Sequence, residues 1–284
     1  MSALSGVRRV WTVLKPPPAT PDGTMSLYDH LRELRYRVII SALAVVVTAS
    51  LAAFFYRTVL NLVMWPWHSA LTDLKAANPD VATQVVNQEI SGPFMLALKV
   101  SAMAGLMLAC PVWLYQLWKF IVPALLDKEK RYARNFVVSA IPLFLLGCAV
   151  GYFVLPKGIS VMLQFTPDGL GIVNQLDLNK FLQLELLLIL LFGVSFLLPV
   201  ILVMLNLAGV VTGQQLAKAR TFAIFGCFVF GAVATPSTDP FSMTALALPM
   251  AIMYVAAEFI CRRNDKAKAK RLAASGGVLV SIDD

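Results

Sequence analysis

Residues 38–55 read VIISALAVVVTASLAAFF, which is 18 consecutive positions without a charged side chain. A helix needs about 20 mainly apolar residues to cross a hydrocarbon core of ~30 Å. The whole chain is 58% hydrophobic and 14% charged, whereas a soluble domain has about 25% charged residues. The pattern predicts an all-α polytopic membrane protein with six transmembrane helices, because five further apolar segments follow at residues 93–118, 136–155, 181–207, 221–234 and 241–257.

Basic residues are distributed unevenly between the two sides of these segments. Nineteen Lys and Arg residues lie in the two terminal tails and in the loops after the second and fourth segments. Since loops rich in Lys and Arg stay in the cytoplasm, we expect both termini to be cytoplasmic. The net charge is +8, but the basic residues flank the apolar segments and do not form one patch. Their distribution therefore does not indicate a nucleic-acid partner. The opposite side has only Arg57, Lys75, Lys157 and Lys180.

The chain divides into three expected parts. Residues 1–25 form a flexible cytoplasmic tail, without the apolar core of a signal peptide. Residues 26–262 form the six-helix transmembrane domain, and Ser26 begins a capping box that predicts a helix start near this residue. Residues 263–284 form a basic cytoplasmic tail, with disorder over about the last 20 residues of the chain.

The fifth apolar segment is short, since 14 residues at 1.5 Å each cover only about 21 Å. Either its helix extends into residues 214–220, or the bilayer is locally thinner beside it. Prolines also lie within or near the ends of other segments. Because proline removes a backbone donor, we expect bent helices at Pro111, Pro142, Pro199 and Pro249.

Two acids lie within basic clusters on the same predicted side of the membrane. Glu33 lies in DHLRELRYR (29–37), and Glu129 lies in DKEKR (127–131). Glu33 can pair with Arg37 four residues later, worth only ~0.3–0.5 kcal/mol on an exposed helix, and Glu129 can be a solvated charge. Alternatively, each carboxylate accepts an incoming guanidinium, whose bidentate bonds Lys cannot copy. The residues alone leave both interpretations open.

Other charged residues lie in or beside the apolar segments. An ion within the membrane is costly and is usually paired or functional, so Lys99 and Glu185 either pair with each other or form a functional site. Asp239 lies in a short turn where it can cap the last helix. We expect Glu258 to pair with Arg262 at i+4.

Motifs of enzymes and of metal sites are absent from the sequence. It contains no Walker A, HExxH or GxSxG motif, and its two histidines cannot form a metal cluster. We therefore expect no enzymatic activity, no cofactor and no metal. The four cysteines lack CxxC spacing, and we expect reduced packing residues at Cys110, Cys148, Cys227 and Cys261.

Ordered motifs cover residues 26–260. They are HLxELRxR (30–37), Gly92-Pro93-Phe94 with Lys99, PVxLYQxWxFxxPAL (111–125), Glu129-x-Arg131, FGVSF (192–196), Thr235-Pro236 with Asp239, and LPM (248–250). With these motifs the chain resembles TatC, the multispanning receptor of the twin-arginine protein translocase. The resemblance implies six bent helices in a cup-like arrangement in the bacterial cytoplasmic membrane.

The resemblance also implies a function and partners. Members of this family bind twin-arginine signal peptides and transport folded proteins, driven by the proton-motive force. The implied partners are TatA- and TatB-type single-span proteins, further copies of the chain in a hetero-oligomeric complex, and membrane lipid. Glu33 and Glu129 match the two acids that contact the signal peptide. The resemblance also implies signal-peptide binding by Arg35 and Arg131, and it marks Phe94 and Asp239 as functional.

One position departs from the family pattern. Many members have Ser-Phe-Glu-x-Pro in the fourth span, whereas this chain has Leu197 in place of the glutamate. Our hypothesis is that Glu185, twelve residues earlier, supplies the polar group together with Lys99. Two alternatives remain: a proton-coupled small-molecule transporter with Lys99 and Glu185 as a relay, and a passive scaffold that does not depend on an arginine pair.

Overall fold

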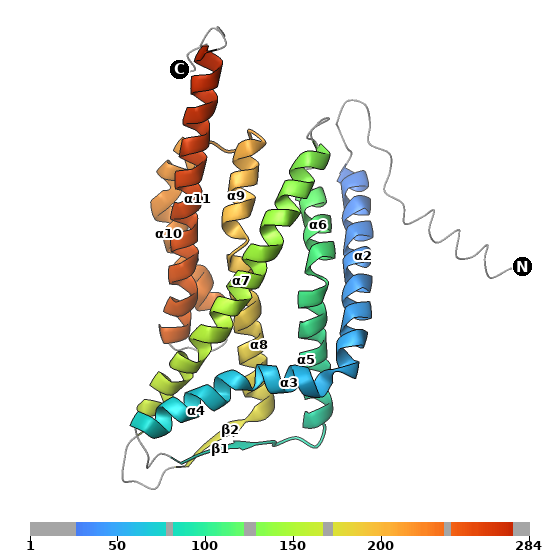
Figure 1. Ribbon diagram of the computed structural model, residues 1–284, viewed down its shortest axis with the longest axis vertical. Helices are drawn as coiled ribbons and strands as arrows, with labels where there is room; N and C mark the ends of the chain where they lie inside the picture. The colour runs from blue at the N-terminus through green and yellow to red at the C-terminus, as the bar shows by residue number, and fades with distance from the viewer. Residues whose placement is uncertain (1–26, 78–81, 122–128, 167–172, 236–239, 275–284) are drawn as a thin grey trace, which may run out of the picture. The chain divides into compact units, whose positions relative to one another are not determined.

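The computed structural model of the protein describes residues 27–77, 82–121, 129–166, 173–235 and 240–274 (Figure 1). Five helical segments are long and apolar enough to cross a membrane, and a bent pair of helices makes a sixth. The six predicted spans are thereby confirmed. The elements are α2 (Leu27–Phe54), α3 (Tyr56–Val63), α4 (Trp65–Ala77), β1 (Ala82–Val86), α5 (Gly92–Leu108), α6 (Cys110–Ile121), α7 (Glu129–Gln164), β2 (Val173–Asp177), α8 (Leu178–Ser195), α9 (Leu198–Leu207), α10 (Gly213–Ala234) and α11 (Pro240–Ala274).

Two of the four predicted proline bends coincide with helix breaks. Helices α5 and α6 meet at an angle of 61°, and Pro111 lies in the first turn of α6, where its missing N–H costs least. Pro199 is likewise in the first turn of α9, two residues after the break between α8 and α9. Pro142 and Pro249 instead lie inside the continuous helices α7 and α11.

The described residues fall into two compact units. The first contains α2, α3, α5, α6 and the two strands, and α2 packs along α5 and α6 (Figure 1). Helices α2 and α5 approach closely at Gly105, where a Cβ atom would lie 2.5 Å from the backbone nitrogen of Ala49. Thr48 Oγ1 donates to the carbonyl oxygen of Gly105 at 2.7 Å. The missing side chain therefore permits a hydrogen bond between the two helices.

A two-stranded parallel sheet in the first unit was not predicted. Strands β1 and β2 pair from Ala82↔Val173 to Val86↔Asp177. Parallel strands require a long crossover rather than a hairpin turn, and here the crossover includes three helices. No local turn motif in the sequence could therefore have indicated the pairing.

The second unit contains the later parts of α7 and α8 together with α9, α10 and α11, and α11 packs against α9 and α10. Helix α10 has 22 residues, which at 1.5 Å each span about 33 Å. This confirms the first explanation of the short fifth segment, since the helix does extend through residues 214–220. Thr212 and Gln215 form a capping box at its start. Buried side chains of this unit pack together at Phe192, Phe196, Cys227, Leu246 and Met250.

A polar cluster fixes the end of α9 to α11. Asn206 is 4% exposed, and its side-chain nitrogen donates to Asp265 Oδ1 at 2.8 Å and to the carbonyl of Val211 at 3.0 Å. Its side-chain oxygen accepts from Asn264 at 2.8 Å. Asp265 Oδ2 accepts from the backbone of Gly213 at 2.7 Å. We call these five residues the Asn206 cluster.

Helix α11 also corrects one prediction about the C-terminal tail. It continues to Ala274, so residues 265–274, expected to be disordered, are helical. The Asn206 cluster supports the first turn of this extension, because Asn264 and Asp265 belong to it. The predicted cysteine packing is confirmed, since all four cysteines are buried free thiols.

Candidate functional site

The carboxylate of Glu33 is buried against Arg37 on α2. Residues four apart lie on the same face of a helix, and the Nε and Nη2 atoms of Arg37 both donate to Glu33 Oε1, with Nε at 3.1 Å. The predicted i,i+4 pair therefore forms. It is not the exposed pair considered above, because Glu33 is 5% exposed and Arg37 is 7% exposed.

The second carboxylate oxygen of Glu33 is free to accept a donor. Oε2 is buried and has no hydrogen-bond partner among the described residues. A buried acceptor without a partner costs about 1–3 kcal/mol, and more when it is charged. A cationic donor that reached Oε2 would remove that cost, so the arrangement suits a guanidinium.

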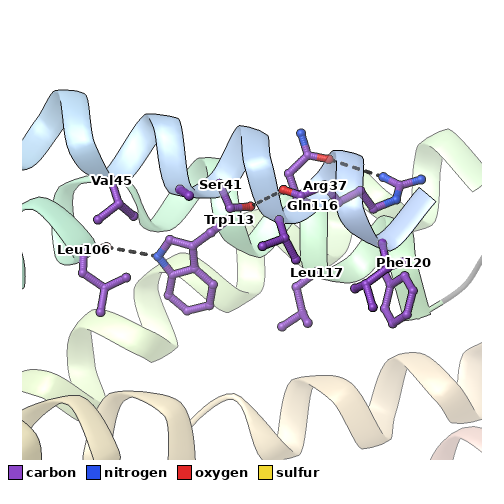
Figure 2. A pocket seen from close by; sticks show the side chains of 11 residues that line it. Arg37, Ser41, Val45, Leu106, Trp113, Gln116, Leu117 and Phe120 are labelled. Carbon is purple, nitrogen blue, oxygen red and sulfur yellow. Dashed lines mark hydrogen bonds between the residues drawn. The ribbon is translucent and has the colours of Figure 1, made fainter. Parts of the chain in front are cut away.

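A third side chain joins this pair from α6. Arg37 Nη1 donates to Gln116 Oε1 at 3.3 Å, and Figure 2 shows the two side chains turned toward each other. They lie at the polar end of a cavity of about 370 Å³ between α2 and the bent α5–α6 pair. The cavity is otherwise mainly apolar, being lined by Leu34, Val38, Ser41, Ala42, Val45, Leu106, Trp113, Leu117 and Phe120.

The other residues expected to contact the signal peptide are placed only in part. Arg35 is exposed on α2, and because it is two positions after Glu33 it lies about 200° away around the helix. Glu129 is the first residue of α7, and Arg131 lies in its first turn. The side chains of Glu129 and Arg131 lie outside the described part of the chain, so the structure does not bring either of them to Glu33.

The prediction that Lys99 and Glu185 pair with each other is wrong. Lys99 Nζ donates instead to Gln183 Oε1 at 2.9 Å. Gln183 and Glu185 are two positions apart, which puts them about 200° apart around a helix, so one lysine side chain cannot serve both. Glu185 is 1% exposed, and neither of its oxygens has a hydrogen-bond partner among the described residues.

Two further positions singled out in the sequence can be compared with the structure, and a third cannot. Phe94 is 69% exposed in the first turn of α5, which suits a contact residue. Leu197, at the position of the family's glutamate, is 2% exposed at the break between α8 and α9. Asp239 lies outside the described residues.

Glu258 forms a larger ionic cluster than predicted. Its expected contact with Arg262 is confirmed at 3.2 Å. Arg220 of α10 also binds it with two hydrogen bonds of 2.8 Å each. The spacing of Glu258 and Arg262 indicated their contact, whereas Arg220 is 38 positions away from Glu258 and no local pattern pointed to it.

The described residues contain no group of three or more His, Cys, Asp or Glu side chains that could hold a metal ion. Sequence reasoning missed Gln116 as a partner of Arg37. It lies 79 positions away, within the LYQxW motif, and only the packing of α6 on α2 brings the two together. The described part of the site is therefore one buried carboxylate, one arginine, one amide and an apolar cavity.

A family model, curated relatives and solved structures that are similar to this chain all point to the same family. The family model described as Sec-independent protein translocase protein (TatC) matches residues 29–249. The TatC protein of Frankia casuarinae is 39% identical over 254 residues, covering 88% of this chain and 69% of its own. That of Escherichia coli K12 is 34% identical, covering 85% of this chain and 90% of its own. A crystal structure described as the twin-arginine translocase receptor TatC in DDM superposes with a TM-score of 0.69 at 33% identity, covering 82% of this chain and 99% of that one.

Proposed function

The chain belongs to the TatC family of Sec-independent protein translocase proteins, and from that premise we propose that Glu33 is a receptor for an arginine of twin-arginine signal peptides. The chain itself is a multi-pass protein of the bacterial inner membrane that acts in twin-arginine translocation. The observation that carries the proposal is the free, buried Oε2 atom of Glu33.

Burial of this carboxylate favours arginine over lysine. A guanidinium presents several N–H donors in a fixed plane, so it can donate to Oε2 and to a neighbouring acceptor at once. An ammonium group is a more strongly hydrated point charge, and it loses more solvation when it enters a buried site. Glu33 therefore discriminates between two peptides of equal charge.

The second arginine of the signal is assigned to Glu129 by the resemblance to the family. Arg35 and Arg131 flank the two acids, and their proposed role is to position the peptide. Phe94, Lys99, Glu185 and Asp239 contribute to later steps of transport. Glu185 supplies the polar group of the fourth span without Lys99 as its partner, since Lys99 binds Gln183.

The arrangement of the complex follows from the same premise. Both termini face the cytoplasm, as the distribution of Lys and Arg indicates, which places Glu33 on the side where signal peptides arrive. TatA- and TatB-type proteins and further copies of this chain complete the translocase. The proton-motive force drives the passage of the folded substrate.

The test is the capture of leader peptides by the purified full-length protein in detergent. We expect Glu33→Gln, which keeps the shape of the side chain but removes its charge, to lose binding of an Arg-Arg peptide. Wild-type protein should bind a Lys-Lys peptide more weakly. Glu89→Gln is the matched control, because Glu89 is exposed and lies far along the chain from α2. Equal binding by the Glu33→Gln and Glu89→Gln proteins contradicts the proposal.

A further inference from the structure

Arg37 already donates hydrogen bonds to the carboxylate of Glu33, as an arginine of the signal peptide would. Its Nε and Nη2 atoms both donate to Glu33 Oε1, and each of the two side chains is less than a tenth exposed. An arriving guanidinium that also uses Oε1 therefore has to displace Arg37. On the basis of the proposed function, we infer that Arg37 is an internal competitor for the arginine site and that Gln116 holds it when it is displaced.

Gln116 is placed to receive the released side chain. Its oxygen accepts from Arg37 Nη1 at 3.3 Å, slightly longer than the usual 2.7–3.2 Å of N–H···O bonds. The bond can shorten once Arg37 no longer has to reach Glu33. Arg37 and Gln116 both line the cavity between α2 and α6, so Arg37 has space in which to move (Figure 2).

The rest of the cavity explains why an acceptor is needed there. Apart from Ser41, whose hydroxyl donates to the Arg37 carbonyl at 2.9 Å, the other lining residues are apolar. A guanidinium that moved along these apolar side chains without an acceptor would leave N–H donors unpaired. Gln116 lowers this cost, and it thereby sets how large a fraction of the protein has Glu33 Oε1 available.

An internal competitor has a defined effect on binding. The apparent dissociation constant of a ligand equals its intrinsic value divided by the fraction of protein in the competent state. For a guanidinium that binds both carboxylate oxygens, the competent state is the one in which Arg37 has left Oε1. An ammonium group needs only the unpartnered Oε2 atom, so displacement of Arg37 weakens the Arg-Arg peptide and not the Lys-Lys peptide. Arg37 and Gln116 therefore set how much affinity a guanidinium gains from binding both oxygens.

The first test replaces the competitor by a weaker one. Arg37→Lys keeps a positive charge beside Glu33 but cannot donate from two nitrogens at once. Loss of one charge-assisted bond should tighten binding of the Arg-Arg peptide by about 10-fold or more. Fluorescent Arg-Arg and Lys-Lys leader peptides, titrated onto the full-length protein in detergent, should show this gain for the Arg-Arg peptide alone. Arg57→Lys is the matched control, because Arg57 is exposed on α3.

The second test removes the alternative acceptor. Gln116→Leu leaves Arg37 in place without its second acceptor, so binding of the Arg-Arg peptide should weaken by about 3-fold, the effect of one modest hydrogen bond. Gln214→Leu, at an exposed position on α10, should leave both affinities unchanged. Thermal unfolding of each variant shows whether it is folded, and either test alone can overturn the inference.

The outcomes separate this inference from the proposed function. Weaker or unchanged binding of the Arg-Arg peptide by Arg37→Lys overturns the role of Arg37 as a competitor. Equal factors for the two peptides, or unchanged binding of the Arg-Arg peptide by Gln116→Leu, overturn it as well. If Glu33→Gln still binds the Arg-Arg peptide as wild type does, the proposed function itself is wrong. If Glu33→Gln loses binding and Arg37→Lys does not tighten it, only the role of Arg37 is overturned.

Discussion

Replacement of Asn206 by leucine tests whether the Asn206 cluster stabilises the second unit. Leucine has the same branching at Cγ as asparagine and suits the apolar helix α9, and the change removes all the side-chain hydrogen bonds of Asn206. Asn206 makes two bonds to neutral groups, Val211 and Asn264, and one to the Asp265 carboxylate. Neutral bonds contribute about 1 kcal/mol each, and a bond to a charged group contributes about 1.5 kcal/mol or more.

The expected loss of stability is smaller than the sum of these three hydrogen-bond contributions. Asn264 and Asp265 are half-exposed, so water can replace Asn206 as their partner, and Asp265 retains its bond to Gly213. We therefore expect Asn206→Leu to lower the free energy of unfolding by about 2 kcal/mol. For a chain of this size that loss lowers the unfolding temperature by about 4–8 °C.

The measurement is thermal unfolding of the purified full-length protein in detergent, followed by circular dichroism. Asn61→Leu is the matched control, since Asn61 is exposed on α3. An unfolding temperature for Asn206→Leu within about 1 °C of this control, well below the expected shift, would refute the reasoning that the cluster stabilises the fold.

Three further predictions concern packing, charge and transport. Gly105→Val should reduce the amount of folded protein in the membrane several-fold, because its Cβ would lie 2.5 Å from the Ala49 backbone, whereas Gly226→Val should be tolerated at a position with no atom within 4 Å. Glu258→Gln should lower the unfolding temperature more than Arg262→Gln does, because it weakens the contacts to both Arg220 and Arg262; a smaller shift for Glu258→Gln would contradict this. Glu185→Ala should slow export of a twin-arginine substrate from cells several-fold at an unchanged protein level, and a normal export rate would exclude a role for this carboxylate.

The sequence could predict the features of this protein that depend on neighbouring residues. Long apolar runs locate the spans because the length of a helix must match the bilayer. The Glu33–Arg37 and Glu258–Arg262 contacts were predictable because residues four apart share a helix face.

Features that depend on tertiary packing were not predictable. Gln116 reaches Arg37 across 79 positions, and Asn206 reaches Asp265 across 59. The expected Lys99–Glu185 pair failed for the same reason. Composition shows that both residues are costly in a membrane, but the rotation of α8 decides that Gln183 faces Lys99. The burial of the Glu33–Arg37 pair was not predictable either, since the spacing of two residues does not show whether their ion pair is exposed to solvent or buried.

The pairing of β1 with β2 has a consequence for the order of biosynthesis. Each residue of β1 pairs with a residue made 91 positions later, and synthesis at about 5–20 residues per second implies a delay of roughly 5–18 s. During that interval the backbone of β1 lacks its partner, while the helices between the strands enter the membrane. Chains truncated before Val173 should therefore be cut by protease within residues 82–86, and full-length chains should resist. Equal cleavage of both would show that the sheet does not protect this segment.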